Sequence, residues 1–93
     1  MPSVVATIQV KEDKVEEAKT FLKELSSETL TSEQGTLAYV FHQQKDDPTR
    51  FVAYEKYQDE EAFKTHSANL ASKGAKFAGI LAGAPQIVML EEI

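Results

Sequence analysis

The chain of 93 residues contains no cysteine, no tryptophan and only two histidines. Without cysteine it cannot form disulfides, bind zinc through thiolates or use thiol catalysis. Two histidines are too few for a histidine-rich metal site, so we expect no metal ligands. No apolar run approaches the roughly 20 residues of a membrane span, and we expect no membrane association.

Positive charge is also scarce, because ten lysines and arginines are set against fifteen aspartates and glutamates, for a net charge of −5. There is no basic cluster, which argues against binding to nucleic acid or to anionic membranes. The first residues lack a basic segment followed by an apolar one and do not resemble a signal peptide. We therefore expect a cytoplasmic protein.

Length and composition predict one globular domain over residues 1–93. Hydrophobic residues make up 42% of the chain and charged residues 27%, a mixture unlike that of disordered proteins. A chain of this size buries only about 60–65% of its unfolded surface, so association would stabilise it considerably.

Hydrophobic periodicity predicts the element order β-α-β-β-α-β. Alternation predicts strands over residues 4–10, 36–43, 50–57 and 86–90. Apolar spacings of three and four predict helices from residue 11 to about residue 29 and from residue 60 towards Gly74, with a short helix over 75–81. Asp59 is a suitable N-cap, and Pro48 marks a hairpin turn. This order is that of the ferredoxin-like α+β fold, a four-stranded antiparallel sheet with both helices on one face.

Neither face of the predicted sheet is polar. In the second strand, Leu37, Tyr39 and Phe41 are expected on one face, with Ala38 and Val40 on the other. Since the helices cover only one face, the second face needs another cover. We predict a homodimer joined through the sheet faces.

Three spaced segments resemble the antibiotic biosynthesis monooxygenase domain: Glu33-x-Gly35-Thr36-x-x-Tyr39, Phe51-x-x-x-Glu55-x-Tyr57 and Glu61-Ala62-x-x-x-His66. The resemblance covers essentially the whole chain and implies a dimeric α+β barrel. It also implies oxidation of phenols or quinols by O₂ without metal, flavin or haem, hence a small-molecule substrate and no cofactor. This chain departs from the family pattern in Thr36, where Cys is common, and in Tyr57, where many members carry Trp.

Two other branches of the superfamily bear on the function. The segments Ile8–Val15 and Pro48–His66 look like an isomerase that acts on a phosphorylated bacterial quorum-sensing dione. Haem-degrading members need an Asn on the first strand, a Trp on the second helix and a later haem-ligating His. This chain has none of these, and His66 stands where that Trp would be.

His66 is the leading candidate for a catalytic residue. It lies on the core-facing stripe of the second predicted helix, with Phe63 and Leu70. An imidazole exchanges protons near neutral pH. In an oxygenase it would deprotonate a phenol, and in an isomerase it would move a proton between carbons beside a carbonyl. The alternative is a buried histidine that bonds a backbone carbonyl.

The remaining candidates surround His66 in the predicted fold. Glu55 and Tyr57 are predicted to act with it, Glu55 either orienting the imidazole or pairing with a cation. The predicted substrate-binding residues are Tyr39, Tyr54, Phe63, Asn69 and Arg50, of which Arg50 suits an anionic group. For the tyrosines the alternative is a place in the core or the interface.

The sequence therefore predicts a cofactor-independent monooxygenase of a small phenolic or quinol-type compound, with His66 as proton acceptor. The alternatives are an isomerase of a small carbonyl compound, possibly a phosphorylated one, and a non-catalytic ligand-binding or structural dimer.

Overall fold

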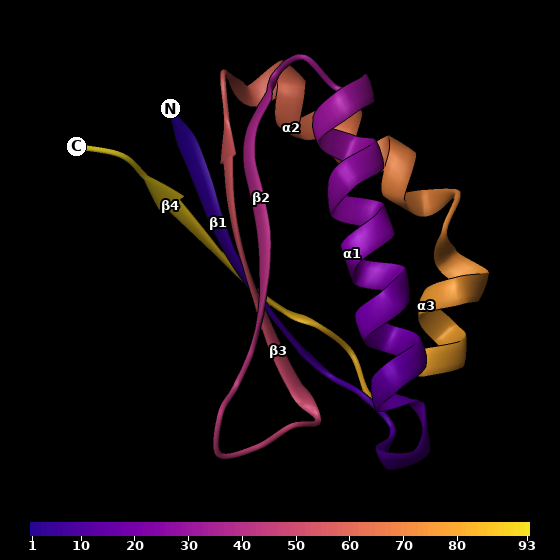
Figure 1. The fold of residues 1–93 in the computed structure, drawn as a ribbon. Helices are drawn as coiled ribbons and strands as arrows, with labels where there is room; N and C mark the ends of the chain where they lie inside the picture. Colours follow the sequence, from indigo (N-terminus) through magenta and orange to yellow (C-terminus); the bar gives the residue numbers. More distant parts are fainter.

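The four strands form one antiparallel sheet in the order β2-β3-β1-β4, and all helices lie on one side of it (Figure 1). A computed structural model describes residues 1–93, and it confirms the predicted ferredoxin-like α+β fold. The elements are β1 Pro2–Gln9, α1 Val15–Ser32, β2 Thr36–Gln43, β3 Arg50–Tyr57, α2 Glu60–Ala71, α3 Gly74–Ile80 and β4 Gln86–Glu91, with a 3₁₀ turn at Glu12–Lys14 before α1.

The helices form where the periodicity and caps predict them. The buried residues of α1 recur at the helical spacings of three and four: Ala18, Leu22, Leu25 and Thr29. The Asp59 side chain accepts a hydrogen bond from the backbone N–H of Ala62 at 2.8 Å and so begins α2. The following α3 starts at Gly74, as a separate short helix. The core between helices and sheet includes Val4, Ile8, Leu22 and Tyr39.

The prediction that Leu37 shares a face with Tyr39 is wrong. A β-bulge shifts the register, since Thr36 pairs with Tyr57 but Ala38 pairs with Lys56. The extra residue interrupts the alternation, so the Leu37 side chain is exposed whereas Tyr39 is buried. The bulge is what turns Thr36 and Tyr39 both toward the helices.

The edge strand β4 has no helix over it (Figure 1). All six of its residues are exposed, and Ile87, Val88, Met89 and Leu90 are each at least 44% exposed. Pairing with β1 places Ile87 and Met89 on the helix side of the sheet and Val88 and Leu90 on the outer side. Both faces of this strand are therefore apolar and uncovered. None of the helices has the length and apolar character needed to cross a membrane.

Candidate active site

The His66 imidazole is enclosed between α2 and the sheet, and its side chain is almost fully buried. The ring of Tyr39 contacts it edge-on, with the ring centroids 4.8 Å apart, and the ring of Tyr57 lies at 5.3 Å. Phe63, one turn earlier on α2, packs edge-on against Tyr57, with an angle of 68° between the ring planes. Three aromatic side chains and the helix therefore hold the imidazole in one orientation.

Glu33, which the sequence predictions did not name as a site residue, is the hydrogen-bond partner of His66. Its Oε1 accepts hydrogen bonds from His66 Nδ1 and Thr36 Oγ1, both at 3.0 Å, and its Oε2 accepts one from Asn69 Nδ2 at 3.0 Å. Residues 33 and 66 are far apart in the chain, so no local spacing relates them. The available signal was the Glu33-x-Gly35 segment of the family pattern, to which no role was assigned.

The loop that carries Glu33 is tied down at both ends. The Glu33 backbone N–H donates to the Thr29 carbonyl at 2.9 Å, which ends α1. The Gln58 N–H donates to the Gly35 carbonyl at 2.8 Å, which joins the loop to the end of β3. Gly35 itself lies against Ala62 of α2, where an added Cβ would be 2.5 Å from the Ala62 Cβ. Close packing of loop and helix thus brings Glu33 to His66.

Glu33 is ionised at neutral pH. Burial alone raises the pKa of this carboxyl, but the hydrogen bonds from Asn69, Thr36 and His66 outweigh burial, and the pKa is held below the ordinary value. A carboxylate only accepts hydrogen bonds, so Nδ1 of His66 carries the proton that it shares with Glu33. In the neutral imidazole, Nε2 then has the free lone pair.

A second carboxyl group lies on the Nε2 side of the ring. Glu55 Oε1 is 3.8 Å from His66 Nε2, too far for a hydrogen bond, and it accepts one from the Tyr57 hydroxyl. Burial raises the pKa of Glu55 more than Tyr57 and His66 lower it. Burial also raises the pKa of Tyr39 and of Tyr57, so both phenols are neutral at pH 7. The polar groups near the Nε2 side of the ring are therefore Glu55, Tyr39 and Tyr57, and in each the raised pKa favours the protonated form.

As a result, His66 Nε2 is a buried polar atom without a hydrogen-bond partner. An unsatisfied buried group of this kind costs about 1–3 kcal/mol of stability. Native structures rarely keep one without a purpose, and a proton acceptor at a catalytic site is one such purpose. The arrangement can remove a proton from an acidic group presented to Nε2.

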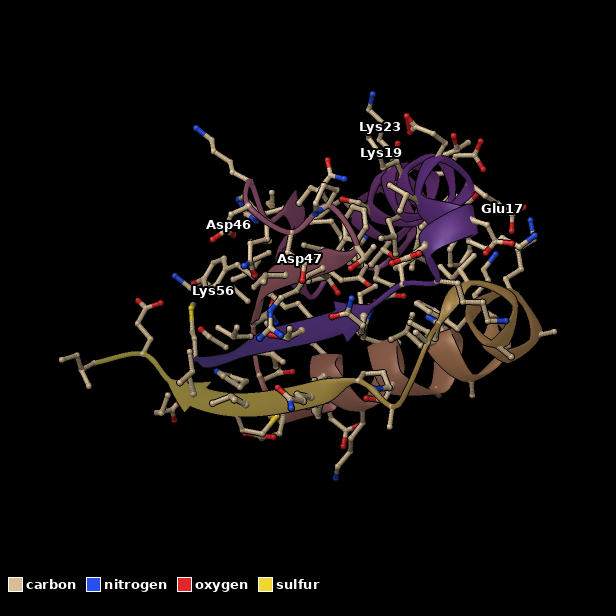
Figure 2. The ribbon with its side chains drawn as sticks, turned by 90° about the horizontal axis from the view of Figure 1, so that it is seen from below. Glu17, Lys19, Lys23, Asp46, Asp47 and Lys56 are labelled. Atoms are coloured by element: carbon tan, nitrogen blue, oxygen red, sulfur yellow. The ribbon has the colours of Figure 1, made fainter.

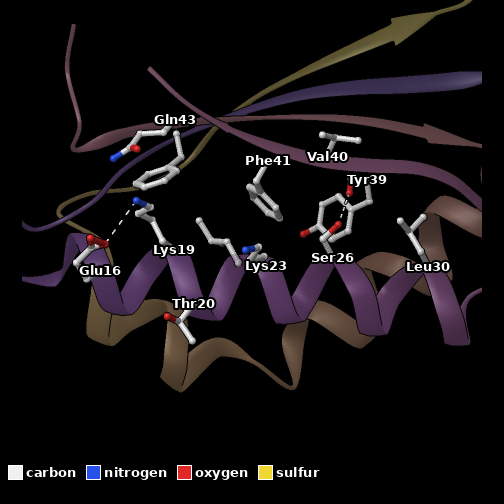
Figure 3. A pocket seen from close by; sticks show the side chains of 12 residues that line it. Glu16, Lys19, Thr20, Lys23, Ser26, Leu30, Tyr39, Val40, Phe41 and Gln43 are labelled. Atoms are coloured by element: carbon white, nitrogen blue, oxygen red, sulfur yellow. Dashed lines mark hydrogen bonds and ion pairs between the residues drawn. The ribbon is translucent and has the colours of Figure 1, made fainter. Parts of the chain in front are cut away.

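A groove of about 670 Å³ runs between α1 and β2, and Tyr39 is one of its lining residues (Figure 3). Tyr39 is the one residue that both lines this groove and contacts the His66 ring. His66 itself lines none of the four principal surface grooves. The Tyr39 ring therefore links the groove to the imidazole.

The structure divides the predicted site residues into two groups. Glu55, Tyr57, Tyr39 and Phe63 surround His66, and Asn69 reaches it through Glu33. In contrast, Tyr54 and Arg50 belong to the outer alternation of β3, opposite the buried Phe51, Ala53 and Glu55. Within one subunit these two side chains cannot contact a molecule bound at His66. No group of three or more histidine, aspartate and glutamate side chains is arranged as a metal site.

Glu33→Gln is expected to change how the free energy of unfolding depends on pH. Because the folded-state pKa of Glu33 is lowered, its stabilising contribution is complete above the ordinary carboxyl pKa and is lost as pH falls through the folded pKa. The difference in unfolding free energy between wild type and variant, about 1–3 kcal/mol at pH 7, should therefore shrink below about pH 4.5. Urea unfolding from pH 3 to 7 measures it. Glu12→Gln, at an exposed position, is the control, and a constant difference for Glu33→Gln over the whole range would contradict the assignment.

Comparison with known proteins identifies the family and supports the fold. The sequence profile of the family described as antibiotic biosynthesis monooxygenase matches residues 1–76. A candidate antibiotic biosynthesis monooxygenase from Caulobacter crescentus is 28% identical, with a TM-score of 0.91 over 99% of this chain and 89% of that one. Another from Nitrosomonas europaea is 27% identical, with a TM-score of 0.84 over 100% and 99%. An antibiotic biosynthesis monooxygenase that is 22% identical shares the fold, with a TM-score of 0.88 over 100% and 99%. No curated protein matches the sequence.

Proposed function

The chain belongs to the antibiotic biosynthesis monooxygenase family, and we propose that it oxidises a small phenolic or quinol-type compound with O₂ and without a cofactor. The observation that supports this most is the buried, unpartnered Nε2 of His66, whose other nitrogen is held by the Glu33 carboxylate. This pair resembles the carboxylate-imidazole arrangement of general bases, in which the carboxylate sets the tautomer.

The proposed reaction begins with transfer of the phenolic proton to His66 Nε2. The resulting phenolate is electron-rich enough to reduce O₂, which a neutral phenol is not. One oxygen atom enters the ring, replacing a ring hydrogen, and the other leaves as water, so that a phenol and O₂ give a quinone and water. The Glu33 carboxylate stabilises the imidazolium formed in the first step, and the neutral Tyr57 phenol adds no negative charge near the phenolate.

The substrate is proposed to enter through the groove between α1 and β2. Tyr39 separates that groove from His66, and its rotation would join the two. Figure 3 shows Tyr39 and Phe41 extending from β2 toward α1, where they form an aromatic wall. Closure of the site around a bound substrate would exclude water from the reactive phenolate.

Oxygen uptake tests the proposal. Metal-free protein incubated with a panel of naphthols, hydroquinones and anthrones is expected to consume O₂ in proportion to the quinone formed. Chelator should not change the rate. An absence of uptake with every aromatic compound would count against the proposal.

A non-catalytic dimer is the second candidate function, because His66 is enclosed in this structure and lines no principal groove. On that view the Glu33–His66 pair only joins α1 to α2. Binding of aromatic compounds without oxygen consumption would favour it.

We also propose that the chain is a homodimer joined through the outer sheet faces. Leu37, Val40, Tyr54, Val88 and Leu90 are each 40–53% exposed. A second copy would remove this apolar surface from water, which a small domain needs. Sedimentation equilibrium at micromolar concentration should give twice the mass of the chain. A single-chain mass throughout that range would contradict the proposal.

A further inference from the structure

The groove between α1 and β2 has the size and lining of a small-molecule site. Its volume of about 670 Å³ lies within the usual range of roughly 300–1,000 Å³ for ligand pockets. Aromatic and aliphatic side chains form its floor: Leu22, Tyr39, Phe41 and Phe51. Ser26 Oγ donates to the carbonyl of Tyr39, the lining residue whose ring contacts His66, and so joins the two walls.

The charge of this groove is opposite to that of the molecule. Two lysines of α1, Lys19 and Lys23, line it together with one acidic residue, Glu16. In each of the other three principal grooves the acidic side chains outnumber the lysines. The lysine-bearing side of α1 is visible in Figure 2, where Lys19 and Lys23 lie close together and well away from Lys56. A net charge of −5 otherwise repels anions from the protein.

Of the two lysines, only Lys23 is free to bind a ligand. Lys19 Nζ lies 3.6 Å from a carboxylate oxygen of Glu16, whereas Lys23 has no carboxylate partner. Lys23 is three residues before Ser26 and so occupies the same side of α1, one turn from the point where Ser26 bonds Tyr39. Its ammonium group therefore lies along the groove from the aromatic wall that leads to His66 (Figure 3).

We propose that this groove binds an aromatic anion, a hydroxyarene that carries a carboxylate, with Lys23 as the partner of the carboxylate. The ring would lie against Phe41 and Tyr39, with its hydroxyl group directed toward His66. The proposal rests on the proposed function in taking the groove as the route to His66. It adds a property that the family resemblance does not specify, a negative charge on the substrate.

Binding of two probes tests the proposal without turnover. Calorimetric titration under anaerobic conditions compares 6-hydroxy-2-naphthoate, whose hydroxyl and carboxylate lie at opposite ends of the ring system, with 2-naphthol, which lacks the carboxylate. Wild type should bind the naphthoate about tenfold more tightly, because a charge-assisted hydrogen bond forms only with the anion. Lys23→Gln should weaken naphthoate binding about fivefold, leave naphthol binding unchanged and reduce the salt dependence of naphthoate binding.

Lys45→Gln is the matched control, since Lys45 also lacks a carboxylate partner but lies in the turn between β2 and β3, outside the groove lining. It should bind both probes as wild type does. Equal affinity of wild type for the two probes, equal losses in Lys23→Gln and Lys45→Gln, or no binding of either probe would each overturn the proposal. Selective binding without oxygen uptake would instead contradict the proposed function and leave the groove assignment in place.

Discussion

His66→Gln should lower the rate of oxygen consumption by a factor of about 10²–10⁴, the range that a positioned general base contributes. The glutamine amide retains a donor for the Glu33 carboxylate, which His66 Nδ1 now bonds at 3.0 Å. The substitution removes the basic nitrogen Nε2, which lies on the side of Glu55 and Tyr57. The expected loss is in kcat more than in KM, because Nε2 acts on the reacting proton rather than on binding alone.

The chain offers a matched control in its other histidine. His42 is exposed near the end of β2, where its Nδ1 lies 3.4 Å from the Val52 carbonyl oxygen, outside the cluster around His66. His42→Gln should keep the full rate of oxygen consumption. Circular dichroism and thermal melts would confirm that both variants fold. A His66→Gln protein that folds and oxidises its substrate at the wild-type rate would remove His66 from the mechanism.

The proposed base also predicts a smaller loss of rate when Glu33 is changed. Glu33→Gln leaves the imidazole in place but removes the negative charge that stabilises the imidazolium formed in the first step. The kcat of oxygen consumption should therefore fall, but by less than in His66→Gln. The two variants thus separate a base from its supporting carboxylate.

Gly35→Ala should destabilise the fold by about 2–3 kcal/mol, within the usual range for overpacking. The added Cβ would lie 2.5 Å from the Ala62 Cβ, a distance too short for two non-bonded carbon atoms. Ala62 cannot rotate away, because its Cβ is fixed to the α2 backbone. Gly35 has a negative φ, so the cost arises from contact and not from backbone conformation. For a domain of this size the midpoint of thermal unfolding should fall by roughly 8–20 °C.

Two further variants make this prediction specific. Gly79→Ala, in α3 and with nothing within 4 Å of the added Cβ, should be neutral or stabilising by up to about 1 kcal/mol. Ala62→Gly combined with Gly35→Ala should recover part of the loss, which a double-mutant cycle detects as a coupling energy. Additive effects of the two substitutions would show that the 33–36 loop and α2 are not in contact as described.

The Gly35 contact links stability to the proposed chemistry. The loop presents Glu33 and α2 presents His66, so a displacement of one from the other lengthens the 3.0 Å hydrogen bond between them. Oxygen uptake by Gly35→Ala at a temperature where it remains folded should therefore also be reduced. A base that is misplaced by about 1 Å can lose 10² in rate.

Local sequence patterns were sufficient to predict most of the fold. The α1 stripe of Ala18, Leu22 and Leu25 has the helical period, and the Asp59 cap forms as expected, because a helix and its cap depend on residues three or four positions apart. The alternation of β3 likewise places Phe51 and Glu55 on one buried face. Leu37 was misplaced because a bulge follows from pairing between strands, which alternation within one strand does not contain.

The candidate site was only partly predictable. His66, Glu55, Tyr57 and Tyr39 were named from the sequence, and the structure brings them together around one ring. Tyr54 and Arg50 were named with them but lie on the other side of the sheet. Neighbouring positions of a strand point to opposite faces, and only the register of Tyr39 with Glu55 shows which face meets His66.

From the sequence alone came the order of the elements, the family, and a titratable histidine on a buried helical stripe, since each depends on residue types and short spacings. The tertiary structure alone decided that Glu33 is the partner of that histidine, that Nε2 has none, and that Tyr39 links the groove carrying Lys23 to the imidazole. These features join residues tens of positions apart. Their geometry is set by how loop, helix and sheet pack together, and no pattern along the chain records it.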